Sequence, residues 1–216
     1  MRNYQVLLAD PPWLFGAWSK AGKGRTAEHH YRTMSIDDLV EMGLWVIDIT
    51  AANSALFMWT TNSTIMEAGR VMEAWGYTYK TIAFAWLKLR KTWHVDPARI
   101  RLNDLPVVAT EAYHHRGLHF GMGHYTRSQS EVCLLGIRGR MAVHDRAVQQ
   151  VICAPTTTHS AKPQEQYGLI DRLYPGTTRL ELFARQRQPG WDVWGAEAPE
   201  SILGPYVGGF NGCISM

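Results

Sequence analysis

The length, composition and charge of the chain limit what it can be. Its 216 residues are 46% hydrophobic, which is enough for one sizeable core. The chain is short for two independent domains. A formal charge of +3 permits a polyanionic partner without requiring one. Three cysteines without a C-x-x-C pair indicate neither a disulfide framework nor a zinc site, and no apolar run approaches the ~18 residues of a membrane span. We therefore expect a cytoplasmic protein with one domain over residues 1–198 and a flexible tail over 199–216.

Residues 4–13, YQVLLADPPW, combine a predicted strand with a carboxylate, two prolines and an indole. The continuous apolar run at 6–9 is typical of a strand covered on both faces in a mostly parallel sheet. Ligands of open α/β sheets bind outside the carboxyl ends of the strands, so Asp10 is expected to point into the binding crevice. Pro11 and Pro12 donate no N–H and present carbonyl acceptors in a nearly fixed direction beside Trp13. This pattern suits a planar substrate with an exocyclic amino group, such as adenine; a strand-ending turn with a buried tryptophan is the alternative.

The following segment, residues 14–30, is rich in Gly, Ala, Ser and Lys and predicts a mobile loop over the crevice. Its glycines lack the spacing and the hydroxyl residue of a phosphate loop, which excludes an NTPase of that type. Lys20 and Arg25 are candidates for contacts with a nucleic-acid backbone, and a solvated loop is the alternative. Ser35 followed by Asp38 predicts a capped helix that ends at about Met42.

Strands and helices then alternate along the chain. An apolar run predicts a strand at 54–60, and apolar residues at helical spacing predict a helix that is capped by Asn62 and ends at Gly76. Further strands are expected at 77–88, 131–136, 149–154 and 180–183, with a helix from Pro163 to the Pro175–Gly176 turn. The unit from 162 to 190 is βαβ-like, and its strand end is suited to hold a nucleoside.

Residues 91–120 interrupt this alternation with an extended loop that carries basic and aromatic side chains. Such a mixture suits backbone neutralisation and base stacking, so the loop is interpreted as a substrate-recognition or dimer-contact segment. Four histidines crowd this region, but they lack the spacing of a metal-binding helix. We expect no metal site from His114, His115, His119 and His124.

Four stretches in this order resemble the adenine-N6 methyltransferases of the D-P-P-W type, the family that includes the catalytic subunit of the eukaryotic mRNA N6-adenosine methyltransferase and bacterial and phage relatives. The stretches are 10–13, 30–39, 121–139 and 159–197. The resemblance covers nearly the whole chain. It implies a single Rossmann-like, S-adenosylmethionine-dependent α/β methyltransferase sheet in which the catalytic motif precedes the cofactor-binding strand. It also implies methylation of adenine N6.

The resemblance assigns roles to individual residues. Lys162 matches a position that contacts the methionine carboxylate, and Ala196 departs from a family position that is commonly Asn. Without the flanking match, Glu181, Arg185 and Arg187 would be equally well explained as surface charges. The implied catalytic residues are Asp10, Pro11, Pro12 and Trp13, and the implied cofactor contacts are Asp10, Lys162, Glu181, Arg185, Arg187, Gly195, Ala196 and Glu197. The candidate substrate contacts are Trp13, Tyr31 and Arg127, together with Lys20 and Arg25 of the basic loop.

Two other functions stay open at this point. A cytosine-N4 methyltransferase makes the same demands on its pocket, and a non-catalytic nucleic-acid-binding subunit of a methyltransferase pair shares the fold. The intact D-P-P-W motif argues against the second alternative, and Ala196 argues for it. We expect nucleic acid as the partner, DNA rather than RNA, with a homodimer or a partner subunit as an open question.

Overall fold

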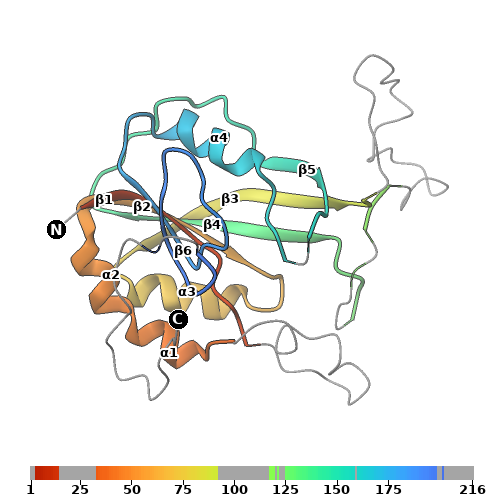
Figure 1. Cartoon of the computed structure of the whole chain (residues 1–216), viewed down its shortest axis with the longest axis horizontal. Helices are drawn as coiled ribbons and strands as arrows, with labels where there is room; N and C mark the ends of the chain where they lie inside the picture. The colour runs from red at the N-terminus through yellow and green to blue at the C-terminus, as the bar shows by residue number, and fades with distance from the viewer. Residues whose placement is uncertain are drawn as a thin grey trace.

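The computed structural model describes residues 3–14, 33–91, 117–119, 121, 125–158, 160–198 and 201. Its strands form one sheet in the order β5-β3-β4-β2-β1-β6-β7 (Figure 1). All neighbouring strands are parallel except at β4, which runs antiparallel to both β2 and β3. The strand bounds are β1 Tyr4–Ala9, β2 Thr50–Thr60, β3 Thr78–Leu89, β4 Ser130–Arg138, β5 Val151–Pro155, β6 Arg179–Leu182 and β7 Asp192–Trp194.

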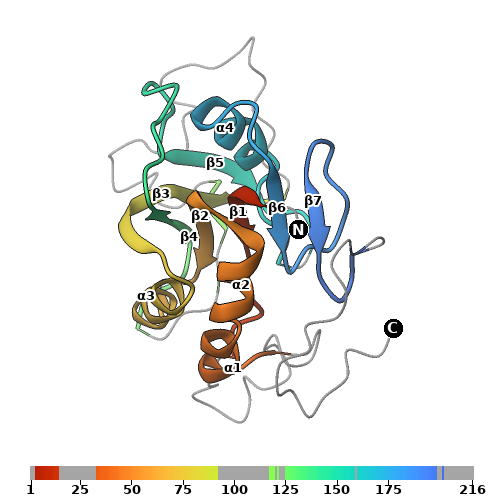
Figure 2. The same cartoon turned by 90° about the vertical axis from the view of Figure 1, so that its left-hand side faces the viewer.

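Helices cover both faces of this sheet. Figure 2 shows α1, α2 and α3 on one face and α4 on the other. Their bounds are α1 Ile36–Glu41, α2 Gly43–Ile49, α3 Ile65–Ala74 and α4 Glu165–Leu173. The three-layer α/β arrangement confirms the predicted Rossmann-like class.

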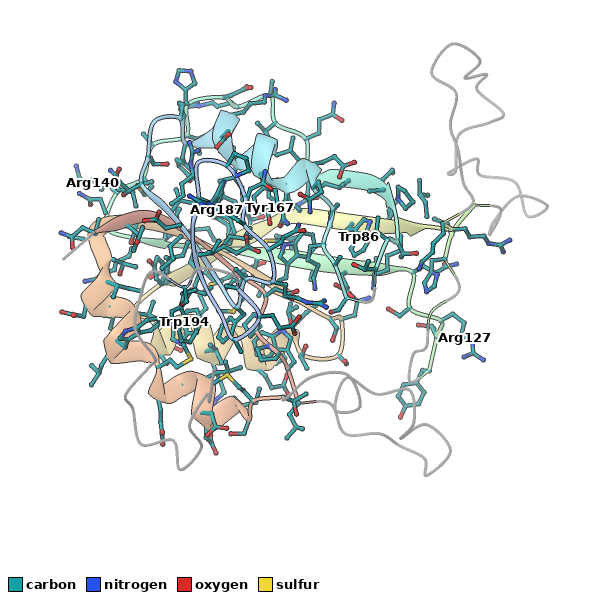
Figure 3. All side chains as sticks on the ribbon, viewed as in Figure 1. Trp86, Arg127, Arg140, Tyr167, Arg187 and Trp194 are labelled. Atoms are coloured by element: carbon teal, nitrogen blue, oxygen red, sulfur yellow. The ribbon has the colours of Figure 1, made fainter. Side chains whose placement is uncertain are left out.

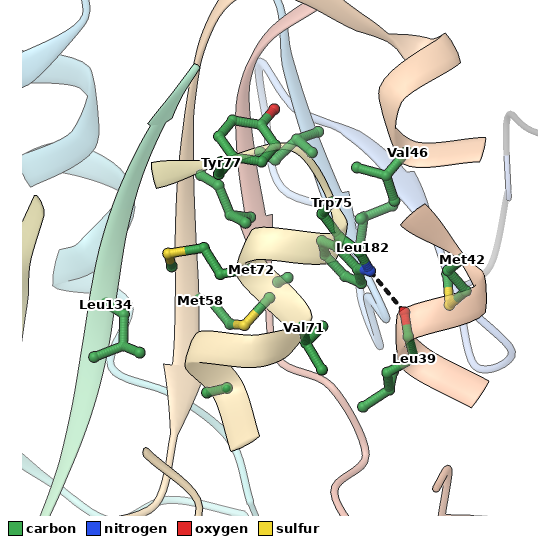
Figure 4. Close-up of a cluster of buried hydrophobic side chains, with 14 of the residues drawn as sticks. Leu39, Met42, Val46, Met58, Val71, Met72, Trp75, Tyr77, Leu134 and Leu182 are labelled. Atoms are coloured by element: carbon green, nitrogen blue, oxygen red, sulfur yellow. Dashed lines mark hydrogen bonds between the residues drawn. The ribbon is translucent and has the colours of Figure 1, made fainter. Parts of the chain in front are cut away.

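The alternation of side chains along β1 divides the core into two clusters. Leu7 and Ala9 pack toward α1–α3, whereas Val6 and Leu8 pack toward α4. The cluster under α1–α3 is drawn in Figure 4, where the Trp75 indole N–H donates to the Leu39 carbonyl over 2.7 Å. Because the period of a strand is two, the residue that follows Ala9 turns to the α4 face of the sheet.

Helix boundaries confirm one predicted cap and correct another. Ser35 and Asp38 form the expected capping box of α1, with reciprocal bonds of 3.1 and 3.0 Å. The prediction that Asn62 caps the next helix is wrong, because α3 begins after Thr64. Asn62 instead donates to the Ser130 hydroxyl at the start of β4. The turn at Thr61–Thr64 delays the helix by using its own backbone bond, Thr64 N–H to Thr61 O, of 3.1 Å.

β1 lies where the winding of the chain reverses. α1 and α2 connect β1 to its parallel neighbour β2 on one face, and α4 connects β5 to β6, the other parallel neighbour of β1, on the opposite face. Such a switch point opens a crevice at the carboxyl ends of the strands. Most of the predicted 91–120 loop and of the 199–216 tail lies outside the described residues.

Candidate active site

Asp10 occupies the carboxyl end of β1 and lines a cleft of about 220 Å³. The register places Ala9 beside Met58 of β2 and beside Leu182, the last residue of β6, so Asp10 extends past the end of β6 while β2 continues to Thr60. The cleft lies on the α4 side of the sheet, where Leu8, Trp59 and Glu181 form its strand-borne wall and Gln166 and Tyr167 of α4 face them. Asp10 thus lies in a cleft at the carboxyl end of β1, and its catalytic role stays a prediction.

The Pro11–Trp13 segment is held by backbone bonds that the sequence does not reveal. The Trp13 N–H donates to the Pro11 carbonyl over 2.8 Å, and the Met34 N–H donates to the Pro12 carbonyl over 2.8 Å. A carbonyl oxygen has two lone pairs, so the Pro11 oxygen keeps the capacity to accept once more. Trp13 itself is only 3% exposed, and its indole N–H donates to the Trp59 carbonyl over 3.0 Å. The contacts of Trp13 in the protein are structural, and its stacking on a substrate base stays a prediction.

Lys162, from the connection between β5 and α4, brings two carboxylates together. Its Nζ lies 2.6 Å from Asp10 Oδ2 and 3.4 Å from Glu131 Oε2. Lys88 forms a second ion pair with Glu131. Burial raises the pKa of Asp10 although Lys162 draws it down, whereas for Glu131 the two lysines outweigh burial and lower the pKa.

The Trp59 ring lies beside the Lys162 ammonium and is itself fixed by Gln166. The Lys162 Nζ lies 5.9 Å from the ring centroid of Trp59, within cation–π range. The Trp59 indole N–H donates to Gln166 Oε1 over 2.6 Å, which ties the end of β2 to α4. The Trp59 side chain is therefore fixed by α4, and the Trp59 backbone carbonyl accepts a hydrogen bond from the Trp13 indole.

Glu181 on the strand-borne wall of the cleft contacts Tyr167 on the facing α4 wall. The Tyr167 hydroxyl donates to Glu181 Oε2 over 3.0 Å. Burial, reinforced by the nearby Asp10 charge, raises the pKa of Glu181 to about 7, against a smaller lowering by the tyrosine bond. Burial and the Glu181 charge also raise the pKa of Tyr167, so this hydroxyl stays a donor. Glu181 is thus a carboxyl group whose charge changes near neutral pH.

The turn after β6 carries backbone strain at the edge of the cleft. Phe183 has φ 62°, a left-handed conformation that is rare for a bulky residue. β7 stabilises it, because the Ala184 N–H donates to the Trp194 carbonyl over 3.0 Å and the Phe183 and Trp194 rings pack edge to face. Gly195 comes directly after Trp194 and lies against this turn, because a Cβ at Gly195 would lie 2.4 Å from the Ala184 carbonyl oxygen. A glycine is required by this close approach of two backbone segments.

The rim of the cleft is formed by an exposed ion pair. Arg185 Nε donates to Glu197 Oε2 over 3.0 Å, which joins the two sides of the strained turn. Both side chains line the cleft together with polar groups from the β5–α4 connection, among them Ser160. Ser160 also has a left-handed φ, 61°. The β5–α4 and β6–β7 connections therefore each contain a non-glycine residue in a left-handed conformation, which is a feature of functional sites.

The structure gathers only part of the predicted set. Asp10, Lys162, Glu181, Arg185 and Glu197 line one cleft, and Gly195 forms the turn beneath it. Arg187, Ala196 and Arg127 are exposed and are not among the residues that line the cleft. Figure 3 shows Arg127 at the periphery, far from Tyr167. The predicted substrate contacts Lys20, Arg25 and Tyr31 lie outside the described residues.

Sequence reasoning missed five residues of the cleft and its surroundings, namely Trp59, Lys88, Glu131, Gln166 and Tyr167. Glu131 opens a strand that was predicted from its apolar pattern alone. Because β4 runs antiparallel, the start of this strand lies at the same edge as the ends of its neighbours β2 and β3. The signal available in the sequence was that Glu131 begins a predicted strand. The sequence does not show the direction in which that strand runs in the sheet.

The donor set of the cleft fits a ligand that carries charges of both signs. Carboxyl groups at Asp10, Glu181 and Glu197 suit cationic groups and hydroxyl donors, and Lys162 and Arg185 suit a carboxylate. S-adenosylmethionine has an ammonium, a sulfonium, a carboxylate and a ribose diol, so these residues fit it. Among the described residues, no group of three or more His, Cys, Asp or Glu side chains is placed to hold a metal ion, and no helix is long and apolar enough to cross a membrane.

A doubly wound α/β sheet with D-P-P-W at the end of β1 and this cleft beside it defines a Rossmann-like methyltransferase. The sequence matches the MT-A70 family over residues 4–197, and the chain belongs to that family of methyltransferases. It is 30% identical over 219 residues to the type II methyltransferase M.MunI of a Mycoplasma species, with 94% of this chain and 81% of that protein covered. The predicted family and enzyme class are confirmed.

Eukaryotic relatives are similar over the same part of the chain. The N(6)-adenosine-methyltransferase subunit METTL3 of Danio rerio is 30% identical over 197 residues, and the human METTL3 catalytic subunit is 29% identical over 197 residues. Each alignment covers 89% of this chain and 28% of the eukaryotic protein. The chain therefore spans little more than a quarter of these relatives.

Proposed function

We propose that the protein transfers a methyl group from S-adenosylmethionine to the N6 amino group of adenine in nucleic acid, with DNA as the preferred substrate. The observation that carries this proposal is Asp10. It lies at the carboxyl end of β1, directly before two prolines, and lines a cleft whose other groups fit the cofactor. Membership of the MT-A70 family supports the same chemistry.

The cofactor would lie along the wall formed by β6 and the connections on either side of it. Lys162 and Arg185 supply the cations for its carboxylate and polar groups, and Glu181 and Glu197 supply acceptors for its ribose hydroxyls and ammonium. When bound there, S-adenosylmethionine supplies an electrophilic methyl group on a positively charged sulfur. The apolar faces of Leu8, Trp59 and Phe183 exclude water from one side of this space.

Asp10 and Pro11 would orient the amine. In its ionised form Asp10 accepts a hydrogen bond from the amino group, and the Pro11 carbonyl accepts the other with its remaining lone pair. Two acceptors draw the nitrogen lone pair out of conjugation with the ring and turn it toward the methyl donor. As the N–C bond forms and the S–C bond breaks, the nitrogen loses a proton. Burial, which raises the pKa of Asp10, makes this carboxylate a better acceptor for that proton.

The preference for DNA follows the similarity to the bacterial type II methyltransferase, which extends over 94% of this chain. The METTL3 subunits, whose names specify N6-adenosine, are similar over 89% of it. If the substrate is a duplex, the adenine must leave the base stack to reach the cleft, and unpaired adenines would be modified at a lower energetic cost.

The test is nucleoside mass spectrometry after incubation with labelled S-adenosylmethionine and, in parallel, unmethylated duplex DNA, single-stranded DNA and RNA. We expect label in N6-methyldeoxyadenosine, formed about 10³-fold more slowly by the Asp10→Asn variant. Label in N6-methyladenosine from RNA would reverse the substrate preference, and label in N4-methylcytosine would change the target base. No label in any nucleic acid, although the cofactor binds, would overturn the proposed activity of the isolated chain.

A further inference from the structure

The charged groups of the active site continue beyond Asp10 and Lys162 as a row of alternating sign. Asp10 contacts Lys162, Lys162 contacts Glu131, and Glu131 contacts Lys88, with distances of 2.6 Å for the first pair and 3.4 Å for the second. The side chains of Lys88, Glu131 and Lys162 are only 17%, 15% and 9% exposed, so solvent screens these contacts weakly. We call these four side chains the charge row.

The positions of Lys88 and Glu131 are set by the sheet and not by flexible side chains alone. β3 and β4 pair antiparallel, with Trp86 opposite Glu131 and Leu87 opposite Ser130, so Lys88 is a diagonal neighbour of Glu131. The Lys88 backbone N–H donates to the Gln129 carbonyl over 2.9 Å, and its ammonium lies 5.1 Å from the Trp86 ring centroid. The ladder between β3 and β4 therefore fixes the outer end of the charge row.

Glu131 competes with Asp10 for the ammonium of Lys162. An ammonium group has three donors, and here it is shared between two carboxylates. If Lys162 paired with Asp10 alone, its ammonium would occupy the acceptor that the substrate amine needs. If Lys162 moved fully to Glu131, the buried Asp10 would lose the cation that keeps it charged. Lys88 supplies Glu131 with a second cation and so limits how strongly Glu131 attracts Lys162.

We infer that Glu131 and Lys88 are positioning residues of this active site, which hold Lys162 shared between Glu131 and Asp10 so that Asp10 is both ionised and available to the substrate amine. Neither residue needs to touch the substrate or the cofactor. Lys88 acts on Asp10 only through Glu131 and Lys162. The inference rests on the proposed function for the role of Asp10, but the charge row itself can be tested without methyl transfer.

The direct test is an NMR titration of the Asp10 carboxyl carbon in ¹³C-aspartate-labelled protein, with the resonance assigned by its loss in Asp10→Asn. The charged groups that act on Asp10 are Lys162 from the β5–α4 connection, Glu131 from β4 and Arg185 from the turn after β6; Glu181 of β6 and Tyr167 of α4 face the same cleft. These stay unchanged in Lys88→Met. That variant should raise the apparent pKa of Asp10 by about one pH unit, because Glu131 then takes a larger share of Lys162.

The substitution Glu131→Gln should have the opposite effect. It removes a negative charge beside Asp10 and leaves Lys162 to Asp10, so the apparent pKa should fall by about one pH unit. In the double variant Lys88→Met/Glu131→Gln the titration should match Glu131→Gln alone, since Lys88 has no other route to Asp10. In variants that keep activity, the acid limb of the pH profile of kcat/KM should move to higher pH in Lys88→Met and to lower pH in Glu131→Gln. The variant Lys88→Arg should keep the native profile.

Matched controls remove exposed charges from the same fold. Lys80→Met changes a lysine of β3, and Glu73→Gln a glutamate of α3, and both side chains are exposed. Neither should move the Asp10 titration, and thermal unfolding should verify that every variant is folded. The inference is overturned if Lys88→Met leaves the titration unchanged, if it shifts the titration in the same direction as Glu131→Gln, or if its effect persists in the double variant. Absence of label in nucleic acid, with these shifts present, would refute the proposed reaction and leave the charge row established.

Discussion

Two clefts open beside β1 and β6, one at the carboxyl ends of these strands, the carboxyl edge of the sheet, and the other at their amino ends, the amino edge. The lining of the amino-edge cleft comes from the starts of β1, β6 and β7, and consists of Asn3, Tyr4, Thr177, Thr178, Arg179, Gly190 and Asp192. The chemistry of the lining, and not the size of the cleft, therefore has to distinguish the two edges.

The two edges differ in how their charged groups are partnered. At the amino edge, Arg179 pairs with Asp171 at 2.5 Å and donates to the Tyr174 carbonyl, all within one short stretch of chain. Tyr4 donates to Asp192 over 2.8 Å. At the carboxyl edge, charged side chains converge from the end of β1, from the β5–α4 connection and from residues 181–197, and burial raises the pKa of both Asp10 and Glu181. Convergent charges with shifted pKa values mark the edge where chemistry is possible.

The largest expected effect contrasts one aspartate from each edge. Asp10→Asn replaces an ionised acceptor with an amide that cannot take the proton, and we expect kcat to fall by about 10³-fold, since a single oriented hydrogen-bonding group contributes 10²–10³. Asp192→Asn at the amino edge should leave kcat within about twofold, because its observed partner is the Tyr4 hydroxyl. Steady-state methylation with each purified variant measures both values. Comparable losses in the two variants would mean that the edges do not differ in function.

A smaller effect is expected from a glycine that supports the carboxyl-edge cleft. In Gly195→Ala the new methyl group would lie 2.4 Å from the Ala184 carbonyl oxygen, so backbone must move. Overpacking of this kind costs about 1–3 kcal/mol of unfolding free energy, and the displaced Glu197 should also weaken cofactor binding. Gly168→Ala in α4 has open space around it and should instead stabilise by about 0.5–1 kcal/mol. Urea denaturation of both variants is the measurement, and equal stability would refute the close contact.

The sequence allowed the prediction of elements whose pattern is local. The apolar run of β1 and the capping box of α1 are signals within a few residues, and both are confirmed. The helix α2 was missed because Met42 both ends α1 and begins α2, with no polar or proline break between them, and because its sequence GLWVIDI also suits a strand. β7 is three residues long, too short for any period to show.

The same distinction between local and long-range signals applies to the residues of the site. Asp10 was predicted because it follows an apolar strand, and Lys162 and Glu181 because flanking stretches resemble a known family. Glu131 and Lys88 carry no comparable signal, since their contact depends on the antiparallel direction and register of β3 and β4. Long-range pairing decides which end of a strand faces the crevice, and a single sequence does not encode that in any short window.

A substitution at the exposed rim of the cleft should have a smaller effect on function than a substitution of one of its buried charged residues. Arg185→Met removes a guanidinium from the cleft and breaks its bond to Glu197, and we expect cofactor affinity to fall about tenfold, or ~1.4 kcal/mol. The matched control is Arg172→Met on α4, which breaks a similar exposed pair with Asp145 and should leave affinity unchanged. Isothermal titration calorimetry compares the two. An unchanged dissociation constant in Arg185→Met would remove this residue from the cofactor site.

The smallest expected effect is a proton linkage at Glu181. Its pKa is raised from an ordinary 4.5 to about 7, so the folded protein holds a proton that the unfolded chain releases, and this carboxyl lowers stability as the pH rises from 4.5 to 7. A cationic ligand in the cleft favours the ionised form. Binding of S-adenosylmethionine at pH 7 should therefore release about half a proton from Glu181, and its affinity should increase with pH up to about 7 and then level off. Calorimetry in buffers of different ionisation enthalpy measures the released protons. Glu181→Gln should remove this release, Glu165→Gln on the exposed side of α4 should not, and an identical release in both would assign the linkage to another group.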